Sequence, residues 1–311
     1  MKRIQYSRYG GPEVLSLVDV DQPKPGRGQI LVRVKAASVN PMDWKIRHGE
    51  MKVMSGSRFP RGLGHDFSGV IDAVGPGVAE FKVGDEVFGA TTIREAGAFA
   101  EYVVVGTNIV ALKPSSITFE HAATMTVVCT AAWIGLMGKA KLKAGQAVLI
   151  TGCLGGVGRS AVQIARMQGA VVTGSCNASR REESLAVGVS EVIDYRAFDI
   201  RSYPGRFDVI FDTAGALSLR QCSSMLKKSG TSLHVVPTPR KMIGSMLSSR
   251  HNIVFANPTP ESFAGISEAA EQGKLAPAIG RVVPLSKATP AIAELEKTGA
   301  PKGKLVIAPM K

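Results

Sequence analysis

A glycine-rich turn between a short apolar strand and an amphipathic helix constrains this chain more than any other feature. In "TGCLGGVGRSAVQIA", Gly152, Gly155 and Gly158 are spaced three apart, and Gly156 lies between them. Such a turn lets backbone N–H groups approach a pyrophosphate at the amino end of the helix. The usual G-x-G-x-x-G frame is not met, because Cys153 replaces its first glycine. A turn that serves only the close packing of helix against strand is the alternative.

Strands and helices alternate from this turn onward. Six segments are predicted strands: "QAVLIT", "AVVTGS", "EVIDY", "FDVIFDTAG", "TSLHVV" and "NIVFAN". The helical patterns between them include "GRSAVQIARMQG", "RREESLAVG" and "LSLRQCSSMLKKSG". The first strand is continuously apolar, which is typical of strands buried in a parallel sheet. The alternation predicts an α/β fold with a doubly wound, parallel, six-stranded sheet.

The first 113 residues are different, with short strands separated by Gly and Pro. "QILVRVKAASV" alternates apolar and polar residues, and "SGVIDAVGPGV", "GDEVFGA" and "AFAEYVVV" follow it. They predict a β-rich, partly barrel-like domain. Pro114 ends this region, and Thr118 is placed to cap a long apolar helix. The closing strand "GKLVIAP" is expected to return to this first domain.

Composition limits the class of protein. A chain of 311 residues suggests two domains. No apolar run reaches the roughly 18 to 20 residues needed to cross a bilayer, and the N-terminus lacks an apolar signal segment. The four cysteines form no CxxC pair and are expected to be reduced thiols. A cytoplasmic protein without a membrane partner is therefore predicted.

The chain carries a formal net charge of +13, and residues 213–260 contain no Asp or Glu. No nucleic-acid motif or interleaved aromatic residues accompany this basic window. A solvated basic surface is therefore favoured over a dedicated anion site.

The end of the second strand of the sheet bears on the cofactor. In an NAD-binding unit an Asp or Glu holds the ribose 2′-hydroxyl here, about 20 residues beyond the glycines. This chain has Ser175, Cys176 and Asn177 instead, followed by Arg180 and Arg181. Small polar residues with a guanidinium suit a 2′-phosphate, so the pattern favours NADP(H). The alternative is a pair of solvent-facing arginines at a helix start.

With these motifs the chain resembles the medium-chain dehydrogenase/reductase superfamily, in its zinc-free quinone oxidoreductase and enone reductase branch. The resemblance rests on "NPMDWKIRHG", "GHDFSGVIDAVGPGVAEFKVGDEVFG", the glycine turn, "VIDY" and "KGKLVI", in that order over nearly the whole chain. It implies a GroES-like catalytic domain over residues 1–118, completed by residues 259–311. It implies a Rossmann NADP-binding domain over residues 119–258, with the active site in the cleft between the two. Relatives also form a homodimer through the edge strand, here "NIVFAN".

The resemblance implies site residues as well. Asn40 is expected near the nicotinamide, and Trp44 either walls the substrate cleft or fills the core; these two are the candidate catalytic positions. Phe255 and Asn257 are expected on the strand that faces the nicotinamide end. The expected cofactor-binding residues are Asn40, Lys45, Thr130, Gly155, Gly156, Val157, Gly158, Ser175, Asn177, Arg180, Tyr195, Phe255 and Asn257. Three alternatives stay open: Lys45 as a surface lysine, Thr130 as a backbone-bonding helix residue, and Tyr195 as a capped strand end.

His65 and Asp66, in "RGLGHDFSG", raise the question of a metal. Zinc-dependent members of the superfamily have a Cys at the position of Asn40, a His matching His65, and a four-cysteine lobe. Here residues 86–105 contain no cysteine, and one His cannot supply the about three protein ligands that catalytic zinc needs. No metal is predicted. His65 and Asp66 are expected to be scaffold residues hydrogen-bonded within their turn, and Asp43 to orient its loop.

These expectations converge on an NADPH-dependent reductase. It would transfer hydride, without a metal, to a small electrophile: a quinone or the C=C bond of an α,β-unsaturated carbonyl. No residue stands out as an essential acid. The alternative is a non-enzymatic NADPH-binding or nucleic-acid-binding protein of the same fold that uses the basic surface, although a small molecule is the favoured partner. The segment "PTPRKMIGSMLSSR" is expected to vary among relatives.

Overall fold

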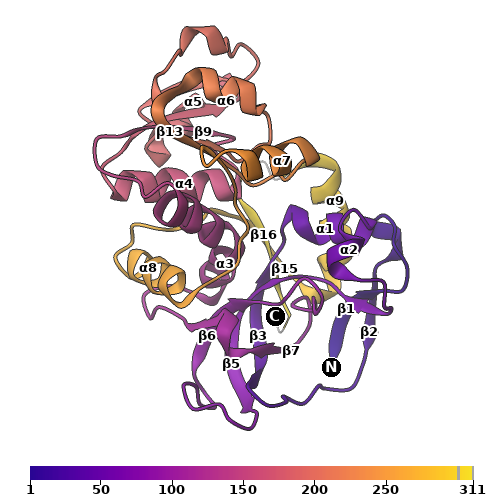
Figure 1. The fold of residues 1–311 in the computed structure, drawn as a ribbon. Helices are drawn as coiled ribbons and strands as arrows, with labels where there is room; N and C mark the ends of the chain where they lie inside the picture. The colour runs from indigo at the N-terminus through magenta and orange to yellow at the C-terminus, as the bar shows by residue number, and fades with distance from the viewer. Residues whose placement is uncertain (300–301, 310–311) are drawn as a thin grey trace. The chain divides into compact units, whose positions relative to one another are not determined.

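The structure, a computed structural model, describes residues 1–299 and 302–309. The chain forms two compact units (Figure 1). The first unit comprises Met1–Val127, Pro258–Glu271 and Ala276–Lys311, and the second comprises Val128–Asn257 and Gln272–Leu275.

The first unit is built on a seven-stranded sheet in the order β15-β16-β3-β5-β6-β8, with β7 also paired to β3. Its strands are β3 (Gln29–Ser38), β5 (Asp66–Val74), β6 (Glu86–Ala90), β7 (Tyr102–Gly106), β8 (Val110–Leu112), β15 (Ile279–Pro284) and β16 (Lys304–Ala308). The closing strand β16, yellow in Figure 1, pairs antiparallel with the indigo β3. This pairing confirms that the closing strand returns to the N-terminal sheet. A smaller sheet has the order β2 (Ser16–Asp19), β1 (Lys2–Tyr6), β4 (Arg61–Gly62).

The core of the first unit follows from the alternation along β3. Ile30, Val32 and Val34 are two residues apart, so they point to the same face of the sheet, and all three are fully buried. They belong to one apolar cluster with Phe67 and Phe99. Burial of each such side chain stabilises the fold by roughly 1.5 to 3 kcal/mol.

Helices α1 (Pro41–His48), α2 (Lys52–Ser55), α8 (Pro260–Glu271) and α9 (Ala288–Thr298) complete the first unit. The start of α1 positions Asn40, which precedes the helix as its N-cap. The Asn40 N–H donates to Asp43 Oδ2 at 2.7 Å, and Pro41 occupies the first helical position, where a missing N–H costs nothing. Gly49 ends the helix with φ of 85°, a left-handed conformation that favours glycine.

Helix α3 (Phe119–Trp133) runs on into a π-helical segment, Ile134–Lys139. Thr118 caps it as predicted, because the His121 N–H donates to Thr118 Oγ1 at 3.3 Å. Of the helices in the described ranges, Phe119–Lys139 is long and apolar enough to cross a membrane, but 67% of its most apolar window is buried inside the structure. A core helix of a folded domain has that character.

The second unit contains a six-stranded sheet in the order β11-β10-β9-β12-β13-β14. All its neighbouring strands are parallel, so the predicted doubly wound α/β sheet is confirmed. The strands are β9 (Ala147–Thr151), β10 (Val171–Cys176), β11 (Glu191–Asp194), β12 (Phe207–Asp212), β13 (Leu226–His234) and β14 (His251–Ile253). The helices between them are α4 (Gly156–Met167), α5 (Arg181–Val187), α6 (Leu219–Met225) and α7 (Pro239–Leu247).

Three segments of the second unit differ from the sequence prediction. The helix expected over "LSLRQCSSMLKKSG" ends at Met225, and β13 begins at Leu226. The strand expected over "NIVFAN" ends at Ile253, so Phe255 and Asn257 lie beyond the strand rather than on it. Helix α7 forms within "PTPRKMIGSMLSSR", which the apolar periodicity did not single out. Thr238 caps α7 by accepting from the Lys241 N–H at 3.3 Å, and Pro239 takes its first turn.

Candidate functional site

A row of polar residues crosses the carboxyl ends of the central strands of the second unit. Thr151 at the end of β9 is in register with Ser175 of β10 and with Asp212 of β12. Asp212 is in turn in register with His234, the last residue of β13. Ligands of doubly wound sheets bind beyond the carboxyl ends of the strands, so this row marks the candidate site.

The glycine turn lies directly beyond β9. Gly155 is the N-cap of α4, and the first i→i−4 bond of the helix runs from the Arg159 N–H to the Gly155 carbonyl at 2.8 Å. The N–H groups of Gly156, Val157 and Gly158 precede that bond, as an anion-binding helix terminus requires. A Cβ at Gly158 would lie 2.1 Å from the Gly152 oxygen, whereas one at Gly155 would lie 3.2 Å from it. Close packing alone therefore accounts fully for Gly158 and only in part for Gly155.

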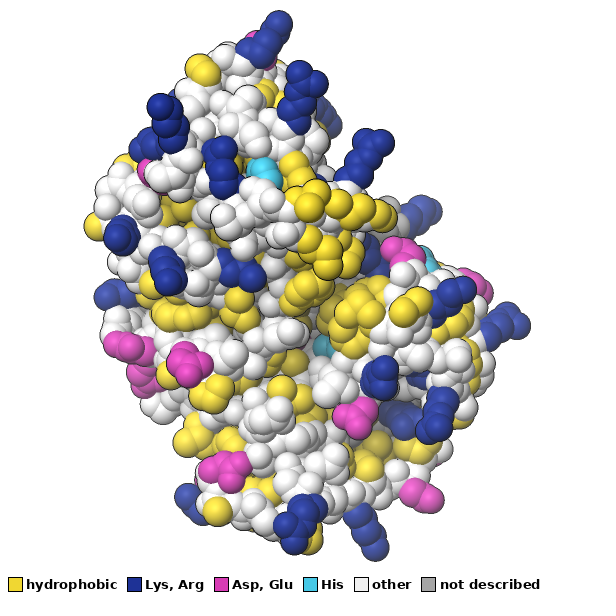
Figure 2. Space-filling model, viewed as in Figure 1, with side chains coloured by type: hydrophobic (Ala, Val, Ile, Leu, Met, Phe, Trp, Pro, Cys, Tyr) yellow, Lys and Arg dark blue, Asp and Glu magenta, His cyan; other side chains and the backbone are white. Residues whose placement is uncertain are grey.

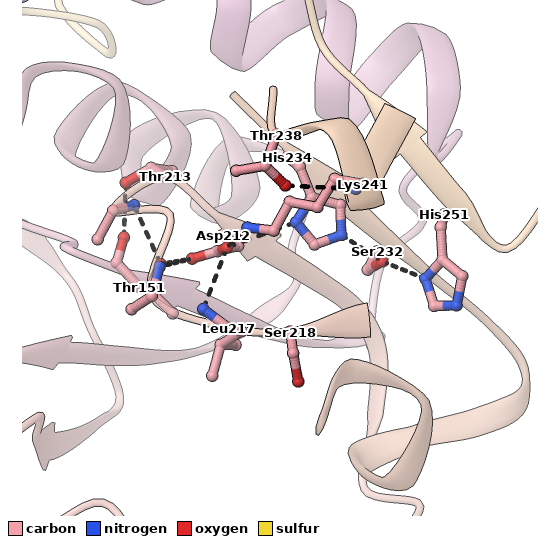
Figure 3. Close-up of polar contacts among 12 residues, drawn as sticks. Thr151, Asp212, Thr213, Leu217, Ser218, Ser232, His234, Thr238, Lys241 and His251 are labelled. Atoms are coloured by element: carbon pink, nitrogen blue, oxygen red, sulfur yellow. Dashed lines mark hydrogen bonds and ion pairs between the residues drawn. The ribbon is translucent and has the colours of Figure 1, made fainter. Parts of the chain in front are cut away.

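Asp212 is the most heavily bonded group at this edge (Figure 3). Its Oδ1 accepts from Thr151 Oγ1 at 2.8 Å and from the Ala216 N–H at 2.9 Å. Its Oδ2 accepts from Lys241 Nζ at 2.7 Å and from the Leu217 N–H at 3.3 Å. Burial alone would raise the pKa of this carboxyl, but hydrogen bonds from His234, Lys241 and Thr151 lower the pKa to about 2. Asp212 is therefore a buried carboxylate that stays charged.

The residues expected to hold the adenosine ribose gather at the ends of β10 and β11. Ser175 Oγ accepts from the Gly152 N–H at 3.4 Å, and the Tyr195 N–H donates to the Cys176 carbonyl at 3.1 Å. Asn177 caps the 3-10 turn that contains Arg180. No carboxylate replaces these polar side chains at the end of β10.

Arg180 has a partner that the sequence did not predict. Its Nε and Nη2 both donate to Glu183, at 2.8 Å each, and Arg159 of α4 also donates to Glu183. Glu183 thus lies between two guanidinium groups. In this arrangement the Arg180 side chain is engaged within its own turn, and a phosphate would have to compete with Glu183 for it.

Thr130 of α3 is fully buried, and its Oγ1 has no hydrogen-bond partner within residues 1–299 and 302–309. A buried hydroxyl without a partner is costly, so this atom is a candidate for contact with a ligand. The alternative role of Thr130, a hydrogen bond from its hydroxyl to the helix backbone, does not occur in the part of the chain that the structure describes. Phe255 is 46% exposed and follows β14 together with Asn257.

Asn40 belongs to a second buried network, in the first unit. Its Nδ2 donates to Asp66 Oδ2 at 2.9 Å, and its Oδ1 accepts from Lys304 Nζ at 2.6 Å. Asp66 also accepts from Ser38 Oγ at 3.0 Å and from the Val127 N–H at 3.1 Å. Burial raises the pKa of Asp66, against the opposing effects of Lys304 and Asn40. Both ends of the Asn40 amide are therefore held in one orientation.

His65 and Asp66 find their partners in other segments rather than within their own turn. His65 Nδ1 lies 2.7 Å from Asp43 Oδ1, while Asp66 bonds to Asn40. Across residues 1–299 and 302–309 no group of three or more His, Cys, Asp or Glu side chains could hold a metal ion. That the protein works without a metal stays a prediction from its sequence.

The two remaining candidates lie on α1. Trp44 is half-buried and packs against the apolar cluster of the first unit, which fits its core-filling alternative. Lys45 is half-buried on the same helix.

Comparison with known proteins gives the family. The family "Alcohol dehydrogenase GroES-like domain" matches residues 26–115, and "Zinc-binding dehydrogenase" matches residues 187–307. The quinone oxidoreductase of Sus scrofa is 32% identical over 325 residues, which cover 99% of this chain and 97% of that protein. This chain belongs to the quinone oxidoreductase family of medium-chain dehydrogenases/reductases.

Two further proteins are similar to this quinone oxidoreductase family member over its whole length or nearly so. The 2-methylene-furan-3-one reductase of Solanum lycopersicum is 32% identical over 321 residues, covering 100% of this chain and 79% of that protein. The solved quinone oxidoreductase from Coxiella burnetii superposes with a TM-score of 0.89 at 30% identity, covering 99% of each chain. The family relationship supports an oxidoreductase.

The residues of the second unit fit a nicotinamide dinucleotide. The α4 amino terminus offers backbone N–H groups beside Gly155 for a pyrophosphate, and Thr130 offers an unpartnered buried hydroxyl. The end of β10 carries the polar residues Ser175 and Asn177 and no carboxylate.

Sequence reasoning missed the functional neighbourhood of Asp212. Asp212 lies inside the segment "FDVIFDTAG" and is the last residue of β12, a position from which its side chain could have been suspected. Lys241 and Lys304 gave no such signal, because a lysine among surface cations cannot be distinguished by sequence from one that is buried. Only the fold brings Lys241 to Asp212 and Lys304 to Asn40.

Proposed function

We propose that this protein is an NADPH-dependent oxidoreductase that reduces a quinone or the C=C bond of an α,β-unsaturated carbonyl, without a metal. The observation that carries the proposal is the end of β10. There, Ser175 and Asn177 replace the carboxylate of NAD-binding units, directly beside the glycine turn of a quinone oxidoreductase family member. A carboxylate at this place would repel a 2′-phosphate, whereas hydroxyl and amide groups can donate hydrogen bonds to its oxygens.

The chain's own residues would bind the cofactor and orient it. Gly155 to Gly158 would receive the pyrophosphate on backbone N–H groups, and Ser175, Asn177, Arg180 and Tyr195 would surround the adenosine ribose phosphate. Thr130, Phe255 and Asn257 would meet the nicotinamide end. When bound, the nicotinamide supplies a hydride.

Asn40, Trp44 and Lys45 are assigned to the catalytic side of the first unit. Asn40 would present an amide of fixed orientation, since Asp66 and Lys304 hold its two ends. Lys45 would contribute positive charge for the cofactor phosphates. The candidate substrate classes come from the relatives, whose names include quinone oxidoreductases and a 2-methylene-furan-3-one reductase.

The remaining assignments complete the proposal. Residues 1–118 with 259–311 would form the GroES-like catalytic domain, and residues 119–258 the Rossmann domain. The protein would act in the cytoplasm on a small molecule, with neither membrane nor nucleic acid as partner. It would form a homodimer through β14, which lies at the edge of its sheet and would otherwise expose unpaired backbone groups.

A substrate panel tests this function. NADPH and NADH consumption would be followed by absorbance with several quinones, enones and enals, with and without a chelator. The expected result is faster consumption of NADPH than NADH with at least one class, unchanged by the chelator. Consumption of neither nucleotide with any acceptor would contradict the proposal.

A further inference from the structure

The Asp212 network extends well beyond one ion pair. Asp212 and His234 are fully buried, and Lys241 is 5% exposed. Asp212 accepts from Thr151 at the end of β9, from the loop after β12 through Ala216 and Leu217, and from Lys241 of α7. One carboxylate therefore ties together the two strand ends and the loop that border the glycine turn.

A chain of polar contacts continues from Asp212 to His234, Ser232 and His251. A carboxylate only accepts, so His234 Nδ1, at 3.4 Å, is its donor. Ser232 Oγ lies 2.8 Å from His234 Nε2 and 2.7 Å from His251 Nδ1. Figure 3 shows this chain from Asp212 to His251. The two imidazoles therefore extend the contacts of Asp212 through Ser232 to the first residue of β14.

Lys241 Nζ forms a buried ion pair with Asp212 Oδ2 at 2.7 Å (Figure 3). Removal of one partner of a buried ion pair leaves the other charge without compensation, whereas removal of both is far better tolerated. Lys241 lies on α7, and Gly244 of the same helix leaves room for the Leu219 side chain of α6, since a Cβ at 244 would lie 2.0 Å from Leu219 Cδ1.

We infer that Lys241 is a positioning residue for the dinucleotide site: by holding Asp212 it fixes the loop 213–218 and the end of β9 in the arrangement that receives the nicotinamide half of the cofactor. The inference rests on the proposed function only in the identity of that ligand. β10 and β12 lie on opposite sides of β9, so the adenosine end, held at the end of β10, would depend little on Lys241.

The test uses the full-length protein with Lys241→Met, Asp212→Asn and the double variant. Lys227→Met is the matched control, because Lys227 pairs with Asp208 at 2.8 Å but is 45% exposed. Hydrogen exchange of the Ala216 and Leu217 amides would be measured without any ligand. Equilibrium binding of NADPH, NADH and 2′,5′-ADP would be measured on the same samples.

Lys241→Met should speed exchange of the two amides at least about tenfold and weaken NADPH binding about ten- to a hundredfold. Binding of 2′,5′-ADP should change less than about threefold. Lys227→Met should change neither the amide exchange rates nor any of the three affinities by more than about threefold. In the double variant, the exchange rates and the NADPH affinity should return most of the way to the wild-type values, because neither charge is then left without its partner.

Three results would overturn the inference: unchanged exchange in Lys241→Met, equal losses for NADPH and 2′,5′-ADP, or a double variant worse than either single one. If the wild-type protein binds none of the three nucleotides, the proposed function fails instead. The exchange measurement still decides whether Lys241 fixes the loop in that case.

Discussion

The prediction of NADPH depends on Arg180, and in the structure Glu183 already occupies the side chain that a 2′-phosphate would bind. The Arg180 guanidinium is 29% exposed and paired with Glu183. Burial would raise the pKa of Glu183, but hydrogen bonds from Arg180 and Arg159 lower it, so Glu183 is charged near neutral pH. A 2′-phosphate must therefore take Arg180 away from a carboxylate rather than meet a free cation.

Arg180→Ala should remove a charge-assisted contact of roughly 1.5 to 3 kcal/mol from NADPH. Because Arg180 must give up Glu183 to bind the phosphate, the expected loss of NADPH affinity lies at the low end of this range, about tenfold. NADH lacks the phosphate, so its binding should barely change. Isothermal titration with both nucleotides checks this, and Arg181→Ala serves as the neighbouring control, since Arg181 donates to the Val192 carbonyl. Equal losses for NADPH and NADH would mean that Arg180 acts on the fold.

Asp212 gives a prediction about acid stability. Its pKa is lowered to about 2 in the folded protein, below the ordinary value of about 3.9. A lowered folded pKa contributes stability that is complete above the unfolded value and is lost as the pH falls through the folded one. Asp212→Asn should therefore reduce the fall in the free energy of unfolding between about pH 5 and about pH 2 by about 2 kcal/mol.

Denaturant unfolding at a series of pH values measures this effect. Asp208→Asn is the control, because Asp208 also has a pKa lowered by hydrogen bonds, against the opposing effect of burial, but its partner Lys227 is half-exposed. Identical pH profiles for wild type and Asp212→Asn would contradict the account of Asp212.

At the scale of elements, the sequence predicted what periodicity and turn chemistry encode. The parallel strands, the glycine turn and the cap at Thr118 were all predicted, because apolar runs and capping residues are local signals. Helix α7 was missed although Met242 and Met246, and Ile243 and Leu247, are spaced four residues apart as in a helix. The end of β14 was misplaced because "NIVFAN" stays apolar after pairing with β13 stops at Ile253.

The site was predictable only where it lies close to a sequence motif. Gly155 to Gly158 and the polar end of β10 could be placed from spacing alone. The Lys241–Asp212 and Lys304–Asn40 contacts join residues 29 and 264 positions apart, and no local pattern specifies such a distance. The partner of Arg180 was missed for another reason, since Glu183 looked like an ordinary first-turn acid of α5.

The exposed face of α7 next to the edge strand β14 predicts a dimer contact. Figure 2 shows hydrophobic side chains gathered over α7, and the exposed ones include Met242, Ile243, Met246 and Leu247. A second copy would cover both this face and the sheet edge. Leu247→Glu should raise the dimer dissociation constant at least about tenfold, as measured by sedimentation. Val53→Glu, at a position 90% exposed on α2, should have no effect, and a monomeric wild-type protein at micromolar concentration would contradict the dimer.

For the whole molecule, the prediction of a metal-free enzyme rests on Asn40 and on the cysteine-free segment 86–105. In the structure, Asn40 bonds to Asp66 and Lys304, and His65 lies against Asp43. Elemental analysis of the purified protein should give well under one zinc per chain, below what a catalytic site requires. Activity should survive dialysis against a chelator. Stoichiometric zinc whose removal abolishes turnover would overturn this prediction.

Transfer of deuterium from labelled cofactor tests the central claim most directly. Each of the two C4-deuterated forms of NADPH would be supplied with an α,β-unsaturated ketone, and the product analysed by mass spectrometry and NMR. The account predicts one deuterium at the β-carbon of the saturated ketone from one of the two labelled forms. It also predicts that turnover with C4-deuterated NADH is slower than with C4-deuterated NADPH under the same conditions. NADPH consumption without deuterium in the product of any enone, together with no reduction of a quinone, would contradict it.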